Sequence, residues 1–267
     1  MANLTWLYAK AALTGFTRRG SSLPPDVRTA RVSVDREHLA AYDRVCGFGV
    51  REELPVTYPH VLAFPLQIEL MTGRGFPFPL PGLVHVANRI TQHRPLLAAE
   101  PLDLRVHVEN LRPHERGRQF DVVSTASVDG EQVWVDVSTY LRRGGGSGGT
   151  EPGDRPEPPR PTGVWEVGGD IGRRYAEVSG DRNPIHLHAL TARAFGFRRA
   201  IAHGMWSKAR CVAAFEGRLP AACTVDVRFK APVLLPAEVD FSASPTGAGW
   251  RFALWSERPH LEGTITG

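Results

Sequence analysis

The segment 175–186 contains residues whose types and spacing suit acid–base chemistry. Asp181 and His186 are five residues apart, with Asn183 and Pro184 between them. Asparagine is a favoured helix N-cap and proline a favoured first helical residue, so we expect His186 in the first turn of a helix and Asp181 in the loop before it. Both side chains could then face one water molecule, one removing a proton and the other delivering one.

Each of these residues also has a simpler interpretation. Aspartate and asparagine before proline are common turn and cap residues, and a single histidine is usually a surface residue. A zinc site is a third interpretation, because His188 and His203 could join Asp181 and His186 as ligands. It is disfavoured because His186 and His188 would diverge on a helix, so we predict no metal and expect His203 to be a turn or supporting residue.

A second segment, Ile201–Met205, begins an apolar run of helical spacing. The start of a buried helix presents backbone N–H groups and a positive dipole end, which would stabilise negative charge developing on an oxygen atom. Gly204 is the expected donor, because a residue without Cβ allows an oxygen to come close to its amide.

Together the two segments resemble the MaoC-like family of (R)-specific enoyl-thioester hydratases and 3-hydroxyacyl-thioester dehydratases. The matching stretches are YAEVSGDRNPIH at 175–186 and GFRRAIAHGM at 196–205. The stretches TYPH at 57–60 and PGLVH at 81–85 look like the degenerate N-terminal hotdog of the two-hotdog members. The resemblance therefore covers both halves of the chain.

The resemblance implies reversible hydration of trans-2-enoyl thioesters and dehydration of (3R)-3-hydroxyacyl thioesters in fatty-acid metabolism. It makes Asp181 and His186 the catalytic pair and leaves open which of them is acid and which is base. From their positions, Asn183, His203 and Gly204 are expected to support the pair. No cofactor is expected, since coenzyme A or the phosphopantetheine of an acyl carrier protein enters with the substrate. Two alternatives stay open: a hotdog thioesterase, and a non-catalytic thioester-binding or partner subunit.

Three further residues are candidates for substrate binding. Lys230 could meet a coenzyme A phosphate, although a solvated lysine at a strand end is the simpler interpretation. His85 corresponds, by the resemblance, to a persistent histidine of the N-terminal half. Phe64 lies in an apolar run that could form core or acyl pocket, and the residues expected to line such a pocket are Leu62, Phe64, Leu66, Phe76 and Phe78.

The elements that must position these residues occur twice. A Gly- and Pro-rich stretch at 143–163 predicts a linker between an N-terminal half, 1–142, and a catalytic half, 164–267. Each half contains an apolar run of helical length, at 60–72 and at 204–219, followed by a strand and a proline-containing segment, at 94–104 and at 231–241. We therefore expect an internal repeat.

Alternating apolar residues predict strands with one buried face. Examples are the series Leu104, Val106, Val108; Val133, Val135, Val137; Val225, Val227, Phe229; and Trp250, Phe252, Leu254. The run from Met205 to Phe215 is apolar over a broad arc, so it should lie inside the curve of a sheet. The expected fold is α+β, a double hotdog with two antiparallel sheets side by side, each wrapped around a helix.

Composition limits the partners and the compartment. The 267 residues carry a formal charge of +4, and their basic side chains are scattered singly and in pairs, which argues against nucleic-acid binding and suits the phosphates of coenzyme A or an acidic carrier. The three cysteines, Cys46, Cys211 and Cys223, fit a reducing, cytoplasmic setting. No apolar run reaches the roughly 18 residues of a membrane helix, and residues 1–20 are expected to form a docking helix. We expect a monomeric pseudo-dimer or a homodimer of it.

Overall fold

The computed structural model describes residues 22–144 and 157–267. The docking helix expected in residues 1–20, and most of the linker expected at 143–163, fall outside these ranges. The first half contains β1 (Arg28–Val32), α2 (Arg36–Cys46), α3 (Tyr58–Thr72), β2 (Leu83–Gln92), β3 (Leu102–His114), β4 (Gly117–Val128) and β5 (Glu131–Arg143). The second contains β6 (Gly163–Val167), α4 (Ile171–Ser179), α5 (Pro184–Leu187), α6 (Ala189–Ala194), α7 (Gly204–Ala213), β7 (Cys223–Phe229), β8 (Ala237–Thr246), β9 (Gly249–Trp255) and β10 (Pro259–Thr266).

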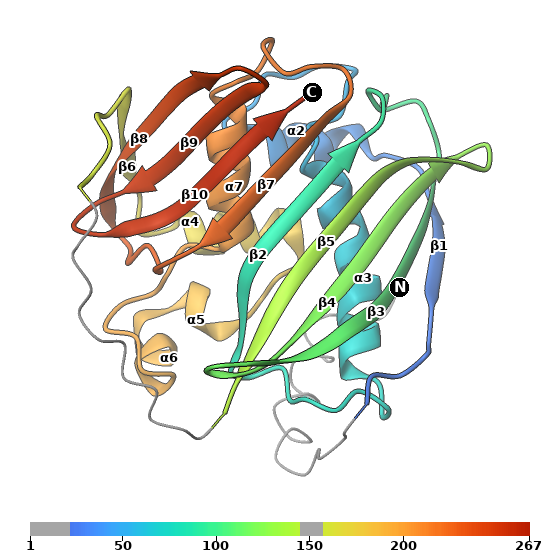
Figure 1. Ribbon diagram of the computed structural model, residues 1–267, viewed down its shortest axis with the longest axis horizontal. Coiled ribbons are helices and arrows are strands. Elements are labelled where there is room, and N and C mark those ends of the chain that lie inside the picture. The colour runs from blue at the N-terminus through green and yellow to red at the C-terminus, as the bar shows by residue number, and fades with distance from the viewer. Residues whose placement is uncertain (1–21, 145–156) are drawn as a thin grey trace.

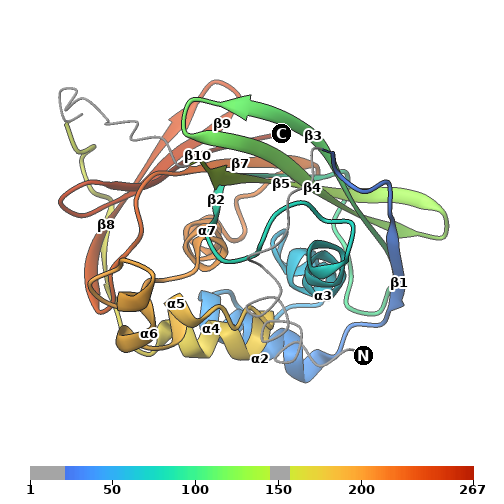
Figure 2. The ribbon, with the colours of Figure 1, turned by 90° about the horizontal axis from the view of Figure 1, so that it is seen from below.

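The two halves share one antiparallel sheet of ten strands (Figure 1). Its order is β1-β3-β4-β5-β2 followed by β7-β10-β9-β8-β6, so the second five strands repeat the first five in reverse. The halves meet where β2 pairs with β7, from Ala87 opposite Arg228 to Gln92 opposite Cys223. The sheet curves over α3 and α7, which lie side by side beneath it (Figure 2). The predicted double hotdog is confirmed.

The order of elements also repeats, with one difference. A strand, a helix, a buried helix and four strands occur in each half, but α5 and α6 are inserted between α4 and α7 in the second half. This insertion contains the Asn-Pro-x-His stretch, and the first half has no counterpart among its described residues.

The two central helices are buried on nearly every side, with 11 of the 15 residues of α3 and 8 of the 10 residues of α7 inaccessible to solvent or nearly so. The helix expected at 60–72 begins slightly earlier, at Tyr58, after Thr57. The helix expected at 204–219 is shorter than predicted and ends at Ala213. Its following residues form tight turns in which the Phe215 amide donates to Val212, and Gly217 adopts a φ of 75°, so the apolar pattern continues after the helix has ended.

In β5 the residues that face the core are not the ones expected from the sequence pattern. In β5, Trp134, Asp136 and Ser138 are buried, whereas Val135 and Val137 are only half-buried. The prediction that the valines at alternate positions form the buried face was therefore wrong beyond Val133. The reason is a polar network inside the sheet that requires Asp136 and Ser138.

This network, which we call the seam network, consists of Lys208, Asn88, Asp136, Ser138 and His60. The Lys208 side chain is 0% exposed, and its Nζ donates to the Asn88 side-chain and backbone oxygens and to the Val225 backbone oxygen. The Asn88 amide donates in turn to Asp136 and Ser138, and the ring Nδ1 of His60 bonds to the other Asp136 oxygen. Burial lowers the pKa of Lys208 to about 7, while Asp136 acts in the opposite direction. The seam network thus ties α7 of one half to β2, β5 and α3 of the other.

Two expectations from composition can be compared with the structure. The three cysteines are free and buried, as expected of small apolar residues. Among the helices of the described residues, none combines the length and hydropathy needed to cross a membrane.

Because the seam network is buried, removing its cation should be costly. We expect Lys208→Met to lower the free energy of unfolding by about 3–5 kcal/mol, since it leaves the oxygens of Asn88 and the backbone oxygen of Val225 without their donor in the interior. The matched control is Arg105→Met, which removes an exposed charge from β3 and should change stability by less than about 0.5 kcal/mol. Urea denaturation measures both, and equal stability of the two variants would contradict a stabilising role for the network.

Candidate active site

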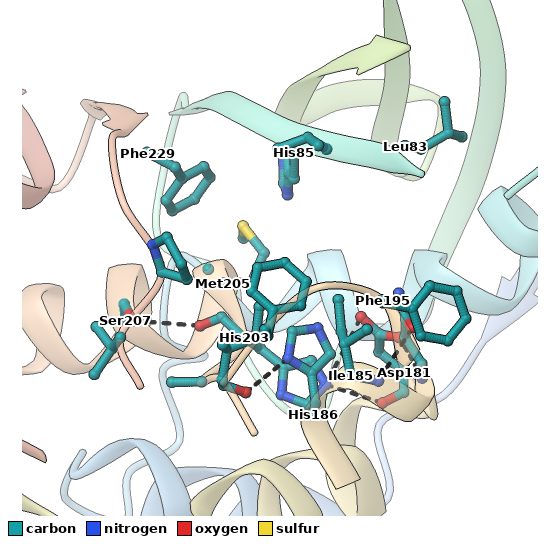
Figure 3. Close-up of a pocket in the computed structure, with 18 of the residues that line it drawn as sticks. Leu83, His85, Asp181, Ile185, His186, Phe195, His203, Met205, Ser207 and Phe229 are labelled. Atoms are coloured by element: carbon teal, nitrogen blue, oxygen red, sulfur yellow. Dashed lines mark hydrogen bonds and ion pairs between the residues drawn. The ribbon is translucent and has the colours of Figure 1, made fainter. Parts of the chain in front are cut away.

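A cavity of about 750 Å³ lies between the two halves and is lined by residues of both. The second half of the chain contributes five of the residues expected in the site: Asp181, Asn183, His186, His203 and Gly204. His85 and Leu83 face them from β2, with Phe229 beside His85 (Figure 3). The structure therefore brings together all five residues that the sequence suggested for the catalytic pair and its support.

Asp181 is held in a short loop after α4. The helix ends at Ser179 because Gly180 adopts a left-handed conformation with a φ of 73°. The backbone N–H of Asp181 then donates to the Ser179 hydroxyl at 3.1 Å. Asp181 Oδ1 accepts from the backbone N–H of Asn183, also at 3.1 Å. The Asp181 side chain is 25% exposed, so its carboxylate is fixed in position and still reachable from the cavity.

The predicted cap at Asn183 is confirmed. Its Oδ1 accepts from the Ile185 amide at 3.4 Å, and Pro184 is the first residue of the four-residue helix α5. His186 follows in the same turn and is buried. Its Nδ1 lies 2.8 Å from the backbone oxygen of Ile201. Because a carbonyl oxygen can only accept, Nδ1 carries the proton and Nε2 keeps a free lone pair.

Burial lowers the pKa of His186 below its usual value, although the nearby Asp181 opposes the shift. The ring is therefore neutral at neutral pH. A neutral imidazole whose Nε2 lone pair is available beside a carboxylate is equipped to accept a proton.

His203 supports this arrangement from the start of α7. Its ring stacks on that of His186 with centroids 3.7 Å apart and an interplanar angle of 25°. Its Nε2 lies 3.0 Å from the Asp181 backbone oxygen and 3.8 Å from Oδ2. Burial, with His186 contributing, lowers the pKa of His203 to about 3, so this ring also stays neutral. His203 links the Asp181 loop to the His186 ring.

The same three residues are the closest approach to a metal site among the described residues. Ligand atoms of Asp181, His186 and His203 lie within 4.8 Å of one another, while His188 is exposed at the start of α6 and does not belong to the group. However, Nδ1 of His186 and Nε2 of His203 each donate to a carbonyl oxygen. These two bonds leave each histidine with one ring nitrogen as a possible ligand atom.

Gly204 is the first residue of α7, so its N–H has no acceptor within the helix. A Cβ at this position would lie 3.1 Å from the Phe229 ring. A side chain here would therefore push the Phe229 ring outward, and Gly204 lets Phe229 pack closely while it lines the cavity.

The three candidate substrate-binding residues also line the cavity. His85 stacks on Tyr140 at 4.6 Å, its Nε2 has no hydrogen-bond partner among the described residues, and burial lowers its pKa to about 3. Phe64 contributes from α3. Lys230 forms an ion pair with Glu262 at 3.0 Å, which neutralises much of its charge.

The predicted acyl pocket was partly wrong. Phe76 and Phe78 pack against Phe120 in the core of the first half, and Leu62 and Leu66 pack against the same core. The prediction also missed Tyr140 and His60, which line the cavity from β5 and α3. His60 was visible in the TYPH stretch, but Tyr140 lies in a strand without any distinguishing signal.

Comparison with known proteins adds independent information. Residues 151–254 match the family described as MaoC like domain. The chain is 37% identical to 3-hydroxyacyl-thioester dehydratase X of Mycobacterium tuberculosis, over 98% of this chain and 96% of the relative. It resembles the crystal structure of HtdX from that organism with 39% identity and a TM-score of 0.81, over 90% of this chain and 99% of that chain. A MaoC-like dehydratase from Phytophthora capsici, 17% identical with a TM-score of 0.74 over 92% and 96% of the two chains, shares the fold.

The position of His186 depends on close packing between α4 and α5. A Cβ built on Gly172 would lie 2.0 Å from the His186 backbone oxygen, so α4 can pack here only through a glycine. We expect Gly172→Ala to lower the free energy of unfolding by about 1–3 kcal/mol, the usual cost of overpacking.

The matched control is Gly169→Ala, because a Cβ there would meet its nearest neighbour, Pro236, at an ordinary 3.8 Å. This variant should be as stable as the parent in the same denaturation experiment. If the two alanine variants were equally stable, the close packing of α4 on the His186 turn would not constrain the site.

Proposed function

Because this chain belongs to the MaoC-like dehydratase family, we propose that it catalyses the reversible hydration of trans-2-enoyl thioesters to (3R)-3-hydroxyacyl thioesters in fatty-acid metabolism. The observation that carries the proposal is the neutral His186 ring, with its Nε2 lone pair available, beside the Asp181 carboxylate on the wall of a cavity large enough for an acyl group. On this proposal the protein is a hydro-lyase that acts on the α,β carbon–carbon bond of the acyl group and leaves the thioester bond intact.

The geometry suggests how the residues divide the work. In hydration, His186 Nε2 takes a proton from a water whose oxygen bonds to the β-carbon. The proton taken by His186 is passed through the Asp181 carboxylate to the α-carbon on the same face, so that the hydroxyl and one hydrogen of the water both end on the substrate, and dehydration reverses both transfers. The Gly204 amide and the start of α7 stabilise the negative charge that develops on the thioester oxygen. Asn183 and His203 fix the two reacting side chains in place.

The first half contributes a wall of the cavity and half of the sheet. His60, Phe64, His85 and Tyr140 come from it, while both groups proposed for proton transfer come from the second half. We therefore assign one catalytic site to the chain and place it in residues 164–267. No metal or redox cofactor takes part in this mechanism, and the buried free cysteines suit the cytoplasm.

The catalytic assignment can be tested by substitution. We expect Asp181→Asn and His186→Ala each to lower kcat by about 10²–10⁴-fold, the usual effect of losing a general acid or base. Hydration is followed by the ultraviolet absorbance of trans-2-enoyl-CoA substrates of increasing chain length. The matched control is His188→Ala, which removes an exposed histidine two residues away and should leave kcat unchanged.

Near-normal turnover by either variant would disprove the role of that residue. Release of free thiol by the parent protein would favour a thioesterase. Binding without turnover of any substrate would favour a thioester-binding or partner subunit.

The metal interpretation needs its own test, because three potential ligands do lie close together. We expect dialysis against EDTA to leave the hydratase rate unchanged, since His186 and His203 use ring nitrogens to bind carbonyl oxygens and to stack. Loss of activity on dialysis, followed by recovery with zinc alone, would replace the acid–base mechanism with a metal-assisted one.

A further inference from the structure

One short segment of this chain has an excess of positive charge. Residues 171–199 contain two acidic residues, Glu177 and Asp181, and six arginines, so the segment has a formal net charge of +4, which equals that of the whole chain. The arginines are all exposed and are Arg173, Arg174, Arg182, Arg193, Arg198 and Arg199. Although basic residues look scattered along the sequence, the rest of the chain is neutral on balance.

Some arginines of the chain pair with carboxylates, as Arg36 does with Glu52 and Arg94 with Glu100. Others, such as Arg105, form no ion pair within the described ranges. Among the described residues, none of the six forms an ion pair. Three of them donate only to backbone oxygens: Arg173 to Leu187, Arg193 to Arg198, and Arg199 to Pro236. Their charge is therefore available to an external partner.

Two large apolar side chains are exposed in the same segment. Leu190, on α6, is 77% exposed, and Phe195, directly after α6, is 46% exposed. Exposed apolar residues together with arginines are typical of protein–protein interfaces, in which aromatic and arginine side chains are enriched.

The segment lies beside the cavity. Four of its residues line the cavity: Arg182, Leu187, Phe195 and Phe197. Leu190 lies on α6, between Leu187 and Phe195. Helices α4, α5 and α6 pack against one another on the side of the molecule opposite the sheet, and α6 is at its outer edge (Figure 2). We call the exposed surface formed by residues 171–199 the arginine surface.

We propose that the arginine surface docks an acidic carrier protein, which presents the acyl thioester to the cavity on its phosphopantetheine arm. This inference rests on the proposed function and specifies the carrier of its substrate. A carrier protein fits better than free coenzyme A because the six arginines spread over α4, α6 and the loops that follow these two helices, and because Leu190 and Phe195 need an apolar protein surface to cover them. The nucleotide of coenzyme A offers phosphates but no such surface.

The test compares one acyl chain on two carriers. The substrates are a trans-2-enoyl group attached to acyl carrier protein and the same group attached to coenzyme A. The variant is Arg193→Glu/Arg198→Glu, and the matched control is Arg105→Glu/Arg251→Glu, which makes the same charge change on exposed residues of β3 and β9. A third variant, Arg193→Lys/Arg198→Lys, keeps the charge.

We expect the first variant to lower kcat/KM for the carrier-bound substrate by at least about tenfold, because charge reversal at a docking surface slows association. Its kcat/KM for the coenzyme A substrate should change by less than about threefold, which also shows that the variant is folded. The control and the lysine variant should stay within about threefold of the parent on both substrates.

Several outcomes would overturn the proposal. An equal loss on both substrates would mean that these arginines bind nucleotide phosphates, and an unchanged rate on both would mean that they dock nothing. A parent protein that uses only the coenzyme A substrate would refute carrier docking while leaving the hydratase function intact. Failure of the parent on both substrates would instead refute the proposed function.

Discussion

The fold depends on a buried lysine at the junction of its two halves. Lys208 has no access to solvent, so burying its amino group is costly unless oxygen atoms accept its hydrogen bonds. Those oxygens come from β2 and β7, the two strands whose pairing joins the half-sheets, and Asn88 extends the network to Asp136 and His60. The lysine therefore fixes α7 against the first half, and with it the position of Gly204 and His203 at the start of that helix.

The site itself is built from a short insertion and two glycine contacts. Helices α5 and α6 interrupt the repeated order of elements, and the first of them carries His186. Gly172 lets α4 approach the backbone of that helix, and Gly204 lets Phe229 approach α7. The proposed acid–base pair thus lies between α4 and α7, which correspond to α2 and α3 of the first half. Only the second half has an insertion at this point.

Sequence reasoning succeeded where the determining contacts are local. The Asn183 amide binds Asp181 and the Ile185 amide binds Asn183, each two residues away, so cap and turn preferences were enough to predict the course of this loop. It failed where contacts span long separations. The buried face of β5 depends on the hydrogen bonds of Asp136 to Asn88 and His60, which lie 48 and 76 positions earlier in the sequence. The alternation of apolar residues in β5 cannot predict these distant partners. The stacking of His203 on His186 and the cavity position of Tyr140 likewise follow from the packing of elements distant in sequence.

Fusion of two hotdogs in one chain also changes how the protein can evolve. In a dimer of identical hotdogs every substitution appears twice, so a change that reshapes the acyl wall also alters the copy that performs proton transfer. Here Phe64, His85 and Tyr140 are encoded separately from Asp181 and His186, although all five line one cavity. Mutations in α3, β2 and β5 can therefore alter the range of acyl groups accepted while the residues proposed for chemistry keep their sequence.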